Sequence, residues 1–65
     1  MARLKVRLRT LRRERRMTRE ELAKKARVAE LYISQLEAGP LENPSPPVLR
    51  RLAKALGVSV GELLE

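Results

Sequence analysis

The sequence predicts an all-α protein, a single domain over residues 1–65 built as a compact bundle of five helices. Apolar residues recur at spacings of three and four along most of the chain, which is the period of a helix face. Two capping boxes, in which Ser or Thr is followed three residues later by Glu, begin at Thr18 and Ser59 and mark helix starts. Gly39 and Gly57 follow periodic segments, where a left-handed residue commonly ends a helix.

Residues 3–16 are compatible with two patterns. Leu4, Leu8 and Leu11 recur at helical spacing, whereas Leu4, Val6 and Leu8 also alternate with cations as they would in a strand. Only the helical period extends to Leu11, and the RRERR run that follows contains good helix formers. We therefore predict a helix here and keep the strand as an alternative.

The segment from residue 17 to residue 39 is the centre of the predicted fold. A helix opens at the Thr18 cap and covers about 19–26, residues 27–29 make a tight turn, and a second helix covers about 30–38. On a helical wheel, the side of this second helix that must face the core carries Ala29, Ile33 and Leu36.

The opposite side of the helix over 30–38 is unusual for a surface. A solvated helix face usually carries Lys and Glu, but this side has short polar and apolar residues, namely Leu31, Gln35, Ala38 and, beside them, Ser34. A helix that enters the major groove of DNA can have such a face, because these groups read base edges while cations outside the groove hold phosphates.

Two more helices complete the predicted bundle. Residues 39–47 form a Pro-rich connecting loop, since proline cannot lie inside a helix. Ser45 and Pro46 start the next helix, which ends at Gly57. Its apolar face carries Val48, Leu49, Leu52, Ala53 and Leu56. The second capping box, Ser59 with Glu62, opens a short last helix that contains Leu63 and Leu64.

Composition and charge narrow the function. The net charge is +7, and residues 1–30 hold 12 of the 15 Lys and Arg against four Glu, which favours a polyanionic partner over a merely solvated surface. Because the chain has no constellation of His, Cys or Asp, we expect no metal, no cofactor and no enzyme activity. Because we find no ligand-sensing domain, we expect no small-molecule ligand. We also expect a cytoplasmic protein, because no apolar run approaches the roughly 20 residues of a membrane span and no signal-peptide core is present.

Three motifs are specific enough to indicate a family. They are the Leu-Ala pair in the helix over 19–26, the run Y-I-S-Q-L-E-x-G, and the run L-A-K-A-L-G-V-S. Over residues 4–64 the chain resembles the Cro/C1-type helix-turn-helix family, also called XRE, which includes the phage repressors and Cro proteins. The resemblance implies a lambda-repressor-like fold and sequence-specific binding of double-stranded DNA by a transcriptional regulator, in particular a repressor. It also implies a homodimer on a palindromic operator.

The resemblance implies residue roles by position. The helix over 30–38 would lie in the major groove, with base contacts from Glu30, Leu31, Tyr32 and Gln35. The expected phosphate contacts are Arg19, Arg27, Ser34 and Asn43. A structural ion pair is expected between Arg12 and Glu37, and dimerisation is expected to involve Val58, Val60, Leu63 and Leu64.

Each expected base contact also has a structural interpretation. Gln35 could bond N6 and N7 of adenine or be a solvated amide. Leu31 could contact a thymine methyl group or be a single exposed leucine. Glu30 could accept from cytosine N4 or stabilise the helix N-terminus as an anion. Tyr32 could donate to a phosphate, pack against the preceding helix, or do both.

The sequence departs from the family pattern in three places. Arg27 occupies a turn position where the family usually has Gly, so we expect a strained or different backbone there. Ala29 stands where the family usually has a Ser or Thr cap, and alanine cannot cap. The loop after Gly39 is about one residue longer than usual, which puts phosphate contacts from this loop in question.

Two alternatives remain open from the sequence. The segment MARLKVRLR could be the strand of a ribbon-helix-helix dimer, with its alternate cations in the major groove. The five-helix fold could instead be a protein-interaction module, such as an antitoxin or adaptor. In that case the apolar residues near the C-terminus would bind a partner protein rather than a second copy.

Overall fold

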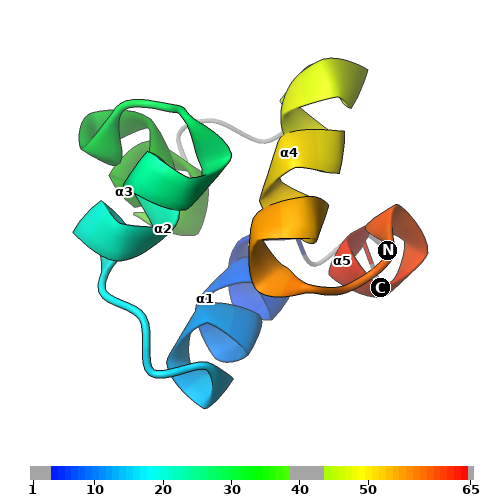
Figure 1. Cartoon of the computed structure of the whole chain (residues 1–65), viewed down its shortest axis with the longest axis horizontal. Helices are drawn as coiled ribbons and strands as arrows, with labels where there is room; N and C mark the ends of the chain where they lie inside the picture. Colours follow the sequence, from blue (N-terminus) through cyan, green and yellow to red (C-terminus); the bar gives the residue numbers. More distant parts are fainter. Residues whose placement is uncertain (1–3, 39–43, 65) are drawn as a thin grey trace.

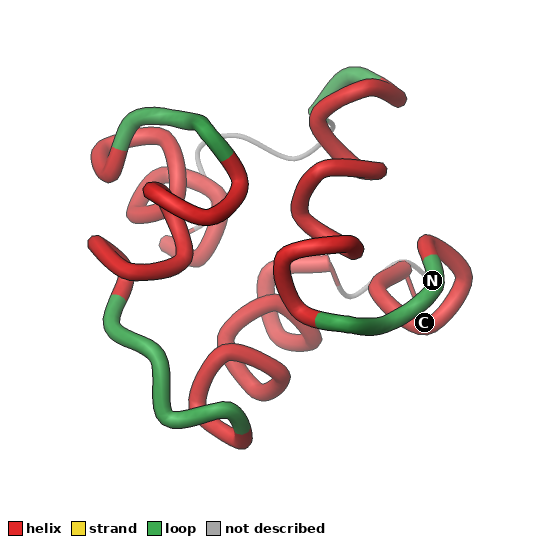
Figure 2. Tube along the Cα trace, viewed as in Figure 1, coloured by secondary structure: helices red, strands yellow, loops and turns green. Residues whose placement is uncertain are grey.

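The computed structural model describes residues 4–38 and 44–64. These residues form five helices, in the order α1 (Leu4–Glu14), α2 (Arg19–Ala26), α3 (Glu30–Ala38), α4 (Pro46–Leu56) and α5 (Val60–Leu64) (Figure 1). Turns and loops join them, and the described part of the chain contains no strand (Figure 2). The predicted all-α fold is confirmed, and the ribbon-helix-helix alternative is wrong because residues 4–9 of its supposed strand are helical.

Side chains cap the starts of α2 and α5 as predicted. At α2, Thr18 Oγ1 accepts from the Glu21 N–H at 3.0 Å, and Glu21 Oε1 accepts from the Thr18 N–H at 2.8 Å. At α5, Ser59 and Glu62 exchange the same two bonds at 3.0 and 2.9 Å. Each box satisfies two N–H groups that would otherwise lack a partner, so both helices begin at defined residues.

The start of α4 has a different chemistry from the predicted one. Ser45 occupies the N-cap position as expected, but its side chain makes no capping hydrogen bond. Pro46 and Pro47 are the first two residues of the helix, and proline has no N–H group to donate to a cap. Two of the N–H groups that usually need a partner at a helix start are therefore absent, and the fixed backbone angle of proline favours the first helical turn.

One hydrophobic core joins the five helices. Its buried residues are Leu8, Leu11, Leu22, Ala23, Ala26, Ile33, Leu36, Leu52, Ala53, Leu56 and Leu63. α2 packs against α3 and α4, and α1 packs against α3 and α5 (Figure 1). Burial of a large apolar side chain contributes roughly 1.5–3 kcal/mol, so the α2–α3 pair is held by a core that all five helices share.

Ala29 is exposed, so the prediction that it faces the core is wrong. α3 begins at Glu30, and Ala29 is still part of the turn, where the angles of a helical wheel do not apply. The predicted end of α3 at Gly39 lies outside the described residues. Ile33 and Leu36, the other two members of the predicted inward side, are buried.

The α2–α3 turn has the strained backbone that its sequence predicts. Arg27 adopts the left-handed conformation, with φ 61° and ψ 47°. Its N–H donates to the Lys24 carbonyl at 3.3 Å, and the Val28 N–H donates to the Ala23 carbonyl at 3.0 Å. A non-glycine residue in this conformation costs roughly 1–2 kcal/mol. The turn is tight, and α3 leaves it in a defined direction.

Candidate nucleic-acid interface

α3 presents an uncharged surface to solvent on the side opposite the core. Leu31 is 66% exposed, the larger value of the two exposed large hydrophobics in the described chain, and Ala38 is also exposed. α3 contains no Lys or Arg, and its second acidic residue, Glu37, points inward and is buried. The predicted outward position of Leu31 is thus present in the structure.

The other expected reading residues lie nearer the body of the protein. Tyr32 is half-buried and packs against the hydrophobic core. Ser34 and Gln35 are half-buried as well, so only part of each side chain reaches solvent. Glu30 is exposed in the first turn of α3, where a negative charge interacts favourably with the helix dipole.

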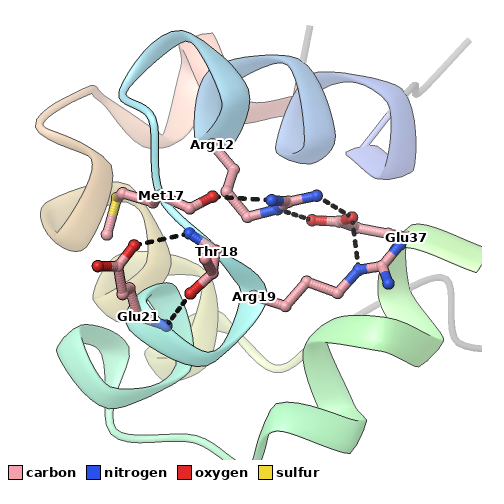
Figure 3. A network of polar contacts seen from close by, with 6 residues as sticks. All are labelled: Arg12, Met17, Thr18, Arg19, Glu21 and Glu37. Atoms are coloured by element: carbon pink, nitrogen blue, oxygen red, sulfur yellow. Dashed lines mark hydrogen bonds and ion pairs between the residues drawn. The ribbon is translucent and has the colours of Figure 1, made fainter.

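The predicted ion pair between Arg12 and Glu37 is present and buried. Arg12 Nε donates to Glu37 Oε2 at 2.7 Å, and Arg12 Nη2 donates to Glu37 Oε1 at 3.0 Å, which is a bidentate pair. Arg12 Nη1 also donates to the Met17 carbonyl at 2.8 Å. Figure 3 shows Arg12 reaching from α1 to the carboxylate on α3. The pair ties α1, the α1–α2 loop and α3 together.

A third charged group, Arg19, joins this pair. Arg19 Nε donates to Glu37 Oε1 at 3.1 Å, while its side chain is 43% exposed (Figure 3). The sequence predicted a phosphate contact for Arg19 but not this bond. A carboxylate can accept several hydrogen bonds, yet nothing in the 18-residue separation of Arg19 and Glu37 indicates that they meet.

Glu37 is ionised in the folded protein although its side chain is fully buried. Burial alone would raise the pKa of Glu37, but the hydrogen bonds and positive charges of Arg12 and Arg19 outweigh it and hold this pKa below its ordinary value. The hydrogen bond to Glu37 in turn raises the pKa of Arg12. At neutral pH the cluster is therefore one carboxylate between two guanidinium groups.

Further cations surround the α2–α3 pair. Arg27 is exposed at the turn, and Arg51 of α4 donates from Nε to the Ala26 carbonyl at 3.1 Å, which satisfies a carbonyl at the C-terminus of α2. The sequence did not predict this contact. A surface depression beside α2 is lined by Arg15, Arg16, Met17, Glu21, Lys24 and Lys25. α3 itself has no Lys or Arg, and these cations lie on α2, on α4 and in the turns at the two ends of α2.

The residues expected at a dimer interface are placed unequally. Leu63 is fully buried in the core, so the prediction that it contributes to dimerisation is wrong. α5 is a five-residue helix that must bury one large side chain against α1, and Leu63 is that side chain. Val58 and Val60 are half-buried against the core, and Leu64 is 38% exposed. Asn43, an expected phosphate contact, lies outside the described residues.

The described residues contain no group of three or more His, Cys, Asp or Glu side chains that could hold a metal ion. Every buried side-chain nitrogen or oxygen among them has a hydrogen-bond partner. No helix in this part of the chain is long and apolar enough to cross a membrane.

Comparison with known proteins places this geometry in a family. A family model described as helix-turn-helix matches residues 8–63. The HTH-type transcriptional regulator DdrOP3 of Deinococcus deserti is 42% identical over 59 residues, which cover 91% of this chain and 45% of DdrOP3. The chain therefore spans less than half the length of this relative.

Solved structures with the same fold are known. The N-terminal DNA-binding domain of SinR from Bacillus subtilis superposes with a TM-score of 0.90 at 37% identity, covering 95% of this chain and 90% of that one. A crystal structure of SinR, described as the master regulator for biofilm formation, in complex with DNA gives a TM-score of 0.92 at 36% identity, covering 97% and 100%. The chain therefore belongs to the Cro/C1-type helix-turn-helix family.

Proposed function

We propose that this chain is the sequence-specific DNA-binding domain of a transcriptional regulator and that α3 lies in the major groove. The observation that carries the proposal is the solvent-facing side of α3, which contains no cation, where Leu31 is 66% exposed and cations lie on the neighbouring elements. Such a surface reads base edges while its surroundings neutralise phosphates. The similar SinR was crystallised in complex with DNA, which supports DNA as the partner.

The side chains divide into two groups by their reach. Glu30, Leu31, Tyr32 and Gln35 face the bases, and Leu31 supplies apolar contact to a thymine methyl group. Tyr32 packs against the core, so its hydroxyl end is the part that approaches DNA. The phosphate contacts come from Arg19, Arg27 and Ser34, together with Asn43 outside the described residues. Arg12 and Glu37 have no contact with DNA and hold the helices in place.

The domain, residues 1–65, acts as a homodimer on a palindromic operator and as a repressor in the cytoplasm. A two-fold dimer sets its two α3 helices about 34–36 Å apart, which is one turn of B-DNA. Val58, Val60 and the exposed Leu64 lie on and beside α5 and are available for this contact, whereas Leu63 is not.

Selection from a pool of random duplexes, followed by titration with salt, tests the proposal. We expect a two-fold-symmetric consensus sequence to be enriched. The logarithm of its binding constant should fall with the logarithm of salt concentration by about 0.9 for each neutralised phosphate. Enrichment of no sequence, together with a slope near zero, would overturn the proposal and favour a protein-interaction module, for which purification of a stoichiometric protein complex is the corresponding experiment.

A further inference from the structure

Glu37 accepts more hydrogen bonds from cations than are needed to compensate its single negative charge. Arg12 already gives it a bidentate pair at 2.7 and 3.0 Å, which compensates a buried carboxylate. The additional bond from Arg19 Nε to Oε1, at 3.1 Å, leaves the cluster with an excess positive charge. The role of this bond therefore has to be sought at the Arg19 end.

Arg19 is the member of the cluster that faces solvent. Its side chain is 43% exposed, whereas that of Arg12 is 10% exposed and that of Glu37 is fully buried. A guanidinium group has five N–H donors in one rigid plane. Glu37 takes the Nε donor, and within the described residues Nη1 and Nη2 of Arg19 have no hydrogen-bond partner. Figure 3 shows the guanidinium group of Arg19, from the start of α2, beside the carboxylate of Glu37.

The fixed Nε gives the remaining nitrogens a defined direction. Because the guanidinium group is planar and rigid, an anchor on Nε restricts the group to few orientations. Arg19 is also the first residue of α2, where the helix dipole favours an anion. An arginine that is ordered before binding loses less conformational entropy when it meets its ligand.

The geometry points to Glu37 as a positioning residue for DNA binding: it holds Arg19 so that the two terminal nitrogens meet a backbone phosphate. This inference rests on the proposed function, because the phosphate belongs to the duplex that α3 reads. Glu37 lies on α3 and Arg19 on α2, so the bond fixes the phosphate contact of one helix relative to the base-reading side of the other.

The direction in which one substitution changes DNA affinity distinguishes this positioning role from a simple effect of net charge. Glu37→Gln removes a negative charge from a DNA-binding domain, and on charge alone it would strengthen binding. A glutamine offers one oxygen, not two, to the three donors that surround Glu37 in the parent, so the Arg19 bond is weakened. Positioning by Glu37 therefore predicts weaker binding.

A double-mutant cycle on the selected duplex tests the inference. We expect Glu37→Gln to lower the affinity of the folded protein about two- to tenfold, the range for immobilising one long side chain. In an Arg19→Met background the same change should have no effect, since Glu37 acts through Arg19. In an Arg27→Met background, a matched loss of one exposed cation, it should keep its full effect. An equal loss in the Arg19→Met background, or tighter binding by Glu37→Gln, would overturn the inference.

A measurement on the parent protein covers the case in which Glu37→Gln does not fold. Hydrogen exchange of arginine Nε–H groups, followed by NMR without DNA, should be slower at Arg19 than at Arg27. Equal exchange at the two arginines would contradict the positioning role. The proposed function fails separately, when the parent itself shows no salt-dependent binding to any selected duplex. If the parent binds but the effects of the Glu37 and Arg19 substitutions simply add, only the positioning role of Glu37 is overturned.

Discussion

The α2–α3 turn and the α4–α5 turn have the same backbone conformation and different residues. The α2–α3 turn spans 26–29 and the α4–α5 turn spans 56–59. The second residue of each, Arg27 or Gly57, is left-handed, with φ 61° and 72°. In each turn the N–H of the following valine donates at 3.0 Å to the carbonyl of the residue five positions earlier. The two turns therefore pose the same conformational requirement. Arg16 meets this requirement as well after α1, with φ 54° and with the Met17 N–H donating to the Arg12 carbonyl at 3.1 Å.

The two turns meet this requirement with different residues. The α4–α5 turn has glycine at the left-handed position and Ser59 in a complete capping box. The α2–α3 turn has an arginine and then Ala29, which cannot cap α3. Local hydrogen bonds and glycine thus stabilise the α4–α5 turn. The α2–α3 turn must instead be held by the core and by the Arg12–Glu37–Arg19 cluster. The strained turn is the one beside the proposed DNA-binding helix, where a cation is useful.

Loss of the cluster should have the largest effect. Glu37→Ala leaves the buried Arg12 without its acceptor and should cost about 3–5 kcal/mol of unfolding free energy. Since 1 kcal/mol shifts the melting temperature of a domain this small by roughly 4–8 °C, thermal unfolding measures it readily. The control Glu62→Ala, which removes an exposed capping carboxylate at α5, should lose far less. Equal losses would mean that the α2–α3 pair does not depend on the cluster.

The pH dependence of stability should report the same group. The folded pKa of Glu37 lies below its ordinary value, so its contribution is complete above the unfolded pKa of about 4.3 and is lost as pH falls through the lower, folded pKa. Stability of the parent should therefore decrease on acidification from about pH 5. Chemical unfolding at a series of pH values should give a shallower decrease for Glu37→Gln, and parallel curves for the two proteins would argue against a lowered pKa.

Exchange of the caps between the two turns should have a smaller effect. Ser59→Ala should cost about 0.5–2 kcal/mol, because it removes the acceptor of the Glu62 N–H. Ala29→Ser should gain part of this amount by supplying α3 with the cap that it lacks. Urea unfolding of both variants tests the pair. If Ala29→Ser gave no gain, the start of α3 would have to be stabilised by something other than a missing cap.

Exchange of the left-handed residues should have the smallest effect. Arg27→Gly should stabilise the fold by roughly 0.5–1 kcal/mol, because relief of strain exceeds the added entropy of the unfolded chain. Arg27→Ala is the control, since it removes the charge and keeps the strain. Gly57→Ala should destabilise through the backbone alone, as a Cβ built there meets no heavy atom within 4 Å. Equal stabilities of Arg27→Gly and Arg27→Ala would show that Arg27 is not strained.

Local patterns predicted most of the helices. The bounds of α2 and α3 agree with the prediction, and α1 ends two residues earlier than predicted, while residue 3 lies outside the described residues. Capping boxes and helical periodicity lie within a few residues of the feature that they indicate, so one sequence is enough to find them. Arg12–Glu37 was expected only because the family resemblance supplied the pairing by position.

Contacts between distant segments could not be predicted in this way. The bonds from Arg19 to Glu37 and from Arg51 to the Ala26 carbonyl join residues 18 and 25 positions apart, and no local pattern encodes them. Leu63 illustrates the same limit, because an apolar residue in a short helix can face the core or a partner. Ala29 shows a further limit of prediction from sequence. A helical wheel assigns a side only to residues inside the helix, and Ala29 lies in the turn before it.

Selection from random duplexes with Gln35→Ala, Leu31→Ala and Arg27→Ala tests the central claim, that α3 reads bases, most directly. We expect Gln35→Ala to lose roughly 1–3 kcal/mol of discrimination at one position of each half-site, and Leu31→Ala to relax the preference at a neighbouring position. Arg27→Ala should weaken binding to all sequences and reduce the salt slope by about one per protomer, with the consensus unchanged. If Gln35→Ala and Leu31→Ala both selected the parental consensus, α3 would not be the recognition helix.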